Sequence, residues 1–369
     1  MQVPFLSLAS QHEPIRAEVL ATIAEVYDKQ WYVLGEQVDA FEHEYSTFSE
    51  VSHTIGVANG LDALHLALIA LGVQPGDEII VPSNTYIATW LAVSYVGAVP
   101  VPVEPSLLTY NIDPALLEAA ITPRTKGIMP VHLYGQACEM GPITEVAGQH
   151  GLWIVEDNAQ SQGAAWHGKL TGSFGQINAT SYYPGKNLGA LGDAGAITTN
   201  DAVLASKVQT LRNYGSQKKY YNEVVGYNSR LDELQAAVLR IKLRELPRWT
   251  RQRQHIASRY NELLAGVGDL VLPVVAEGAT HVYHLYVIRT AQRDALQKYL
   301  AEHGIGTLIH YPVPPHRQQA YADLAIPNVS LPIAEELAAT CLSLPIWPGL
   351  TDEQAEVVAD AIRAFYQAI

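Results

Sequence analysis

The sequence predicts an α/β protein in which a large sheet domain precedes a smaller α+β domain. From about residue 53 to residue 200, short β-rich runs alternate with segments of helical periodicity, which is typical of a parallel sheet covered by helices. Near Asn228 this alternation gives way to one long helical stretch. The 369 residues suffice for two domains at roughly 100 to 200 residues each. We place the large domain at residues 1–245 and the small one at 246–369.

The predicted large domain repeats one strand and helix step several times. The run 53–59 is strand-like and leads into a helix at 60–72, whose leucines recur at helical spacing and which Gly72 closes. The next strands and helices follow the same logic. Strand-like runs are predicted at 77–83, 99–104, 126–133 and 152–159, and helices at 85–97 and 114–121.

The predicted small domain begins within a long helical segment, 229–266, which contains Pro247. Proline removes a backbone donor, so we expect the helix to kink or break there. A strand at 281–289, a helix at 293–304 and a last helix follow. The last helix opens on a capping-box pattern from Thr351 to Gln354.

Composition excludes several classes of function. The formal net charge of -14 argues against a nucleic acid partner, which clustered Lys and Arg would hold. No apolar run approaches the ~20 residues needed to span a bilayer, and the first residues lack a signal-peptide pattern, so we expect no membrane association and a cytoplasmic location. Cys138 and Cys341 lack the spacing of a disulfide framework or a metal site. His281 and His284 would point to opposite faces of a strand, so we predict no metal there either and expect packing or surface roles.

Two polar residues stand at the end of the strand-like run 152–159, at the edge where open α/β sheets bind ligands. Asp157 and Gln160 stand at this carboxyl end. Asp157 alone is equally compatible with capping the next element. A pyridoxal phosphate (PLP) enzyme requires a carboxylate beside the protonated pyridine nitrogen, and Asp157 is suitably placed for that role.

The loop that contains Lys186 lies between two strand-like runs. Most lysines are solvated surface residues, but a Schiff-base lysine needs a partly desolvated site, which a loop at the sheet edge can provide. Gly60 begins a helix and offers N–H groups to a phosphate, although a glycine also eases any tight turn. Ser181 and Asn228 are further candidate donors to the same phosphate. The glycines at 189, 192 and 195 do not match GxGxxG, which argues against a nicotinamide enzyme.

Several segments taken together are far more specific than any one of them. In chain order they are VANGLDAL (57–64), PSNTYIAT (82–89), VEDNAQ (155–160), SYYPGKNLGALGDAGA (181–196) and GYNSRLDELQAA (226–237). They resemble the DegT/DnrJ/EryC1/StrS family of nucleotide-sugar aminotransferases, and the resemblance runs from VPFLSL (3–8) to HYPVPPH (310–316). It implies the PLP-dependent transferase fold type I, which is aspartate aminotransferase-like, and PLP as cofactor with pyridoxamine 5′-phosphate as its intermediate form.

The resemblance also implies roles for individual residues. It places the cofactor on Lys186 and the pyridine nitrogen beside Asp157. The remaining cofactor contacts it implies are Gln160 at the phenolic oxygen, Tyr86 stacked on the ring, and Gly60, Leu61, Ser181 and Asn228 at the phosphate. Asn228 would come from a second subunit, so the family implies a homodimer with shared active sites.

The turn GDAG (192–195), with HLYGQ (132–136) upstream, resembles the branch that aminates C-3 of dTDP-linked 3-keto-6-deoxyhexoses, with L-glutamate as donor. A C-4 aminotransferase acting on a UDP- or dTDP-4-keto sugar is the nearest alternative, and a non-catalytic sensor with the same fold is another. The family's PLP dehydratases replace the lysine by histidine, which Lys186 argues against. Candidates for the nucleotide-sugar pocket, each of which also fits an ordinary surface position, are Tyr183, Lys218, Lys219, His310 and Tyr311.

Overall fold

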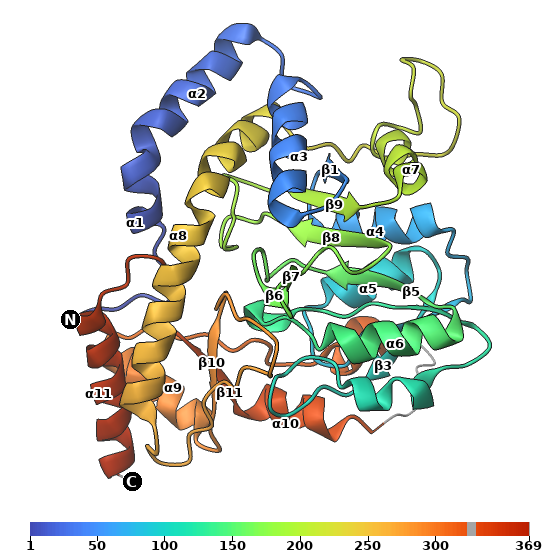
Figure 1. Ribbon diagram of the computed structural model, residues 1–369. Helices are drawn as coiled ribbons and strands as arrows, with labels where there is room; N and C mark the ends of the chain where they lie inside the picture. Colours follow the sequence, from blue (N-terminus) through green and yellow to red (C-terminus); the bar gives the residue numbers. More distant parts are fainter. Residues whose placement is uncertain (323–329, 369) are drawn as a thin grey trace.

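The computed structural model describes residues 1–322 and 330–368. A seven-stranded sheet in the order β1-β9-β8-β5-β4-β2-β3 forms its centre (Figure 1). Strand β9 is antiparallel to both of its neighbours and the other pairs are parallel, so the predicted α/β class is confirmed. The strands are β1 (His53–Val57), β2 (Glu78–Pro82), β3 (Val99–Val103), β4 (Thr125–Ile128), β5 (Trp153–Asp157), β8 (Ile177–Ser181) and β9 (Gly195–Thr199).

Helices pack on both faces of this sheet. Successive residues of a strand point to opposite faces. Ile79 in β2 therefore joins the core around α4, whereas Ile80 joins the core around α6. The helices up to this point in the chain are α1 (Ala9–His12), α2 (Arg16–Lys29), α3 (Glu36–Ser49), α4 (Gly60–Leu71), α5 (Ala88–Tyr95), α6 (Met140–His150) and α7 (Ala202–Arg212).

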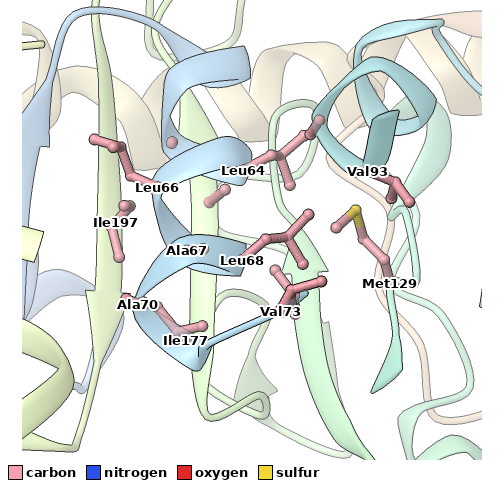
Figure 2. Close-up of a cluster of buried hydrophobic side chains, with 14 of the residues drawn as sticks. Leu64, Leu66, Ala67, Leu68, Ala70, Val73, Val93, Met129, Ile177 and Ile197 are labelled. Carbon is pink, nitrogen blue, oxygen red and sulfur yellow. The ribbon is translucent and has the colours of Figure 1, made fainter. Parts of the chain in front are cut away.

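Helix α4 lies at the centre of the largest apolar core (Figure 2). Leu64 and Leu68 pack toward Val93 and Met129, while Leu66 lies beside Ile197 of β9. A helix that is apolar on nearly every side is stable only when it is enclosed. The enclosure holds the N-terminus of α4 at the carboxyl edge of the sheet, next to the ends of β5 and β8.

The C-terminal part packs around one long helix, α8 (Glu233–Leu264), which passes from the sheet to the C-terminal helices (Figure 1). Of the kink or break predicted at Pro247, the break is wrong, because α8 is one continuous helix. Pro247 sits at an exposed position, and the nearby Leu246 and Trp249 are buried. The remaining elements are β10 (Tyr286–Arg289), α9 (Arg293–Glu302), α10 (Pro332–Thr340), β11 (Cys341–Leu344) and α11 (Asp352–Ala368).

A second apolar core joins α8, α9, α11 and the β10/β11 pair, and Val3 at the start of the chain also packs into it. The predicted capping box is present, since Gln354 N–H donates to Thr351 Oγ1 (3.2 Å) and Thr351 N–H donates to Gln354 Oε1 (3.0 Å). Cys138 and Cys341 are buried free thiols.

Three element predictions need correction. Residues 114–121 form two 3-10 turns, Pro114–Leu116 and Glu118–Ala120, instead of an α-helix. The strand predicted at 281–289 is regular only from Tyr286, because the preceding residues bond irregularly to the loop around Tyr134 and Gly135. Strand β4 ends at Ile128, before the predicted 133. Across residues 1–322 and 330–368, no helix combines the length and apolarity needed to cross a membrane.

Candidate active site

A cavity of about 710 Å³ lies at the carboxyl edge of the sheet, beside the N-terminus of α4 and the loop that follows β8. Its size is typical of small-ligand sites. The structure brings most of the predicted site residues together on its wall. They are Gly60, Leu61, Tyr86, Asp157, Gln160, Ser181, Tyr183, Lys186, His310 and Tyr311.

Asp157 ends β5 and points into the cavity from a buried position. Its Oδ2 accepts a hydrogen bond from Thr89 Oγ1 (2.9 Å) and its Oδ1 accepts one from the N–H of Ala159 (3.1 Å). Burial raises the pKa of this carboxyl above its ordinary value of 3.8, while these two hydrogen bonds and the charge of Lys186 oppose the rise. A positive charge delivered into the cavity would therefore be stabilised by Asp157.

The neighbouring residue, Glu156, points to the other face of β5 and anchors the strand there. Its carboxylate accepts hydrogen bonds from the N–H groups of Gly172 (2.7 Å), Phe174 (2.6 Å) and Gly175 (2.9 Å). It also pairs with His132 Nε2 at 2.8 Å, and both side chains are fully buried. Because His132 Nδ1 accepts the N–H of Cys138 (3.0 Å), the proton of the neutral ring is on Nε2 and is donated to Glu156.

Lys186 sits on a tight turn between β8 and β9, in which its N–H donates to the carbonyl of Tyr183 (2.8 Å). The next residue, Asn187, donates from Nδ2 to the carbonyl of Val282 (3.1 Å), which ties the turn to the C-terminal part of the chain. Burial lowers the pKa of Lys186 from 10.5 to about 8, although Asp157 opposes the change. More of the amine is therefore uncharged near neutral pH than in a surface lysine, and only the uncharged amine can attack a carbonyl or accept a proton.

The N-terminus of α4 forms another wall of the cavity. Asn59 caps the helix by accepting the N–H of Asp62 at Oδ1 (2.8 Å), and its carbonyl accepts the N–H of Ala63. The N–H groups of Gly60 and Leu61 bond to no protein group in the described ranges. A Cβ on Gly60 would approach Ser181 Cβ to 2.6 Å, so only glycine allows this close packing. Two free N–H groups, a helix dipole and the Ser181 hydroxyl together form a site for a small anion.

Gln160 of the cavity wall links Tyr311 of the same wall to the backbone of Tyr134 behind it. Its Oε1 accepts the N–H of Tyr134 (2.6 Å) and its Nε2 donates to the hydroxyl of Tyr311 (3.0 Å). The Tyr311 ring lies 5.5 Å from that of Tyr86, tilted by 41°. His310, the residue before Tyr311, is held by a 2.8 Å hydrogen bond between its Nδ1 and Ser343 Oγ.

Three predicted residues are not in this cavity. Asn228, Lys218 and Lys219 are exposed on the segment that connects α7 to α8. Asn228 Oδ1 accepts a hydrogen bond from Arg230 (2.8 Å), and the two ammonium groups lie over the rings of nearby tyrosines. Within a single chain they therefore lie outside the lining of the cavity that contains Lys186.

The structure also places in the wall three charged or titratable residues that we did not predict, Asp193, Arg253 and His284. We predicted a packing or surface role for His284, but its side chain lines the cavity. The backbone at this residue lies before the regular strand, which begins at Tyr286. Burial, together with the charges of Lys186 and Arg253, lowers the pKa of His284 well below 6.5. A signal for Arg253 was available, because it interrupts a stripe of buried α8 residues at helical spacing, from Leu246 to Tyr260.

Three parts of the cavity wall carry chemically different groups. An anion site lies at the start of α4, a buried carboxylate lies at the end of β5, and an activated amine lies on the loop after β8. Among the described residues, no group of three or more His, Cys, Asp or Glu side chains is arranged to hold a metal ion. The arrangement suits a phosphorylated ligand with a cationic ring nitrogen and a carbonyl that an amine can attack.

Comparison with known proteins agrees with this geometry. The model of the DegT/DnrJ/EryC1/StrS aminotransferase family matches residues 13–363. A dTDP-3-amino-3,4,6-trideoxy-alpha-D-glucose transaminase of Streptomyces venezuelae is 50% identical over 100% of this chain and 97% of its own. A dTDP-3-amino-3,6-dideoxy-alpha-D-galactopyranose transaminase of Aneurinibacillus thermoaerophilus is 49% identical over 98% and 99%.

Among solved structures, S. venezuelae DesV in complex with a ketimine intermediate superposes with a TM-score of 0.97 at 51% identity, covering 100% of this chain and 99% of that one. The predicted fold type I architecture is thereby confirmed. With its activated lysine, buried aspartate and anion site in one cavity, this chain belongs to the DegT/DnrJ/EryC1/StrS aminotransferase family.

Proposed function

We propose that this protein transfers the amino group of L-glutamate to C-3 of a dTDP-linked 3-keto-6-deoxyhexose in deoxyamino-sugar biosynthesis. The observation that supports transamination most directly is the meeting of Lys186 and Asp157 in one cavity. The choice of C-3 and of dTDP rests on the two relatives, whose names specify a dTDP-linked 3-amino sugar.

The cavity fits PLP as the cofactor. We assign its phosphate to the N–H groups of Gly60 and Leu61 and the hydroxyl of Ser181, which donate to no protein group in the described ranges. Ser181 Oγ only accepts the N–H of Tyr183 (3.3 Å). When bound, PLP supplies an electron sink that stabilises negative charge on the carbon that gains or loses the amino group. We place its ring nitrogen beside Asp157. Burial raises the pKa of this carboxyl, so a positively charged ring nitrogen next to it would stabilise the carboxylate.

Lys186 then has two tasks, to hold the cofactor covalently and to move a proton between cofactor and substrate carbon. Its lowered pKa of about 8 suits both, because the amine must be free of its proton to attack and must regain one during the transfer. Gln160 positions the neighbouring wall through Tyr134 and Tyr311, and we place the cofactor's phenolic oxygen beside it. Tyr86 supplies an aromatic face for the ring.

We further propose that two copies share their active sites. Asn228, Lys218 and Lys219 lie outside the cavity of their own chain. The segment that carries them also exposes several apolar side chains. Tyr220 is 85% exposed and Val225 is 89% exposed, which is unfavourable unless a partner covers them. In the dimer, Asn228 would reach the partner's phosphate site, and the two lysines would meet the pyrophosphate of the nucleotide sugar along with Tyr183, His310 and Tyr311. The cytoplasmic location and the division at residue 245 remain predictions.

Absorbance of the bound cofactor tests the reaction. The PLP-loaded protein should change its spectrum on addition of L-glutamate, and of a dTDP-linked 3-amino-6-deoxyhexose in the reverse direction. Lys186→Ala should lower both rates by at least about 10³-fold, whereas Lys126→Ala, an exposed control, should not. A response to the 4-amino isomer alone would move the protein to the C-4 branch. No response to any amine would favour the non-catalytic sensor.

Mixing two inactive variants tests shared sites. If Asn228 acts across the interface, a dimer of Lys186→Ala with Asn228→Asp contains one fully intact site. Random pairing after mixing should then restore about a quarter of the wild-type activity. An absence of restored activity, with mixed dimers demonstrated by mass spectrometry of the native complex, would contradict the shared site.

A further inference from the structure

Arg253 is buried at a position where a charged side chain is energetically unfavourable. It lies on the buried stripe of α8, only 2% exposed, between Trp249 and Ile256. Burial alone lowers its pKa to about 9, and no carboxylate opposes the change within the described part of the chain. A buried guanidinium normally has an anionic partner, because an isolated charge is expensive to remove from water.

The hydrogen bonds of Arg253 leave one edge of the guanidinium free. Nη1 donates to the carbonyls of Tyr283 (3.1 Å), His284 (3.3 Å) and Ile346 (3.0 Å). Nε is buried and has no partner, and Nη2 forms no hydrogen bond in the described ranges. Nε and Nη2 share one edge of the planar group, and this edge is the fork that binds a carboxylate through two parallel hydrogen bonds.

Arg253 belongs to the cavity wall. Arg253 and Lys186 are the two Lys or Arg side chains among the described residues that line the cavity. Lys186 is committed to the amine chemistry. The histidines of the same wall, His284 and His310, are neutral at pH 7, since burial and nearby positive charge lower the pKa of each. Arg253 is thus the remaining fixed positive charge.

The two substrates of the proposed reaction differ in whether they carry a carboxylate near the reacting carbon. L-Glutamate has carboxylates, one of them on the carbon that bears the transferred amino group. The nucleotide-linked keto sugar has no carboxylate, and its charge lies on the pyrophosphate. We propose that Arg253 is the carboxylate subsite of the amino donor, binding it through Nε and Nη2. This inference rests on the proposed transamination and deepens it, because it explains how one cavity admits an amino acid and a sugar in turn.

Glutarate offers a direct test, because it has the carboxylates of glutamate and no amino group to react. Titration calorimetry of the PLP-loaded protein should detect glutarate binding and little binding of its uncharged diamide. Arg253→Lys keeps a charge but loses the fork, so it should weaken glutarate binding about 10- to 100-fold. The matched control is Arg251→Lys, the same change at an exposed position of the same helix, which should leave binding unchanged.

The two half-reactions separate this inference from the function on which it rests. Arg253→Lys should slow the absorbance change driven by glutamate and leave the one driven by the amino sugar within about threefold of wild type. Equal loss in both, with both intact in the wild type, would overturn the carboxylate subsite and leave the transamination standing. A wild type inert toward both amines would instead refute the proposed function. If Arg253→Lys does not fold, equal wild-type affinities for glutarate and its diamide would still overturn the inference.

Discussion

Glu156→Gln should destabilise the fold strongly although it changes one atom and touches no substrate. The four donors around the carboxylate come in two pairs, Phe174 and Gly175 at Oε1, and Gly172 and His132 at Oε2. A glutamine must turn its NH₂ toward one pair, where donor then faces donor. His132 offers no escape, because moving its proton to Nδ1 would set that proton against the N–H of Cys138.

Two hydrogen bonds to a charged acceptor are therefore lost, each worth about 1.5 to 3 kcal/mol. Removing a buried charge recovers part of the free energy lost with these hydrogen bonds. We therefore expect a net loss of about 2 to 4 kcal/mol in the free energy of unfolding. Urea titration of the cofactor-free protein, followed by tryptophan fluorescence, measures it. Glu145→Gln, the same change on the exposed side of α6, should stay within about 0.5 kcal/mol of wild type. A loss below about 1 kcal/mol for Glu156→Gln would refute the reasoning.

Two further changes follow from the packing and titration of the site. Gly60→Ala should weaken PLP binding at least about tenfold, because its Cβ would displace Ser181 from the phosphate site. Fluorescence titration measures this affinity. The control Gly141→Ala should leave it unchanged, since the nearest contact of its Cβ would be an ordinary 3.5 Å. Acidification from pH 6.5 to 5 should lower the free energy of unfolding of the cofactor-free protein by about 1 to 2 kcal/mol for each of His281 and His310. Their pKa values, about 3 and about 4, lie below the unfolded value, so only the unfolded chain takes up protons in this window. Stability that is flat or rises between these pH values would contradict the neutral, buried state of these rings.

Much of the fold and the centre of the site could be predicted because they depend on local pattern. Short β-rich runs alternating with segments of helical periodicity indicated the α/β class, and the end of β5 placed Asp157 at a ligand-binding edge. The capping box of α11 was readable from Thr351 and Gln354 because both partners lie within one helical turn. Lys186 and the fold type came from several motifs in order, which no single spacing would have indicated.

Tertiary structure alone decided the rest, because it depends on which distant segments meet. The pKa values of Lys186 and Asp157 are set by burial, which comes from packing of the whole sheet edge. Arg253 is one of several arginines along α8, and only the contact of that helix with the backbone near residues 283 and 346 turns it toward the cavity. The segment that carries Asn228 lies away from its own cavity, a fact that only the folded chain reveals. Helix α8 continues through Pro247 because burial of its neighbours outweighs one missing hydrogen bond, a balance between local cost and tertiary packing that no local pattern contains.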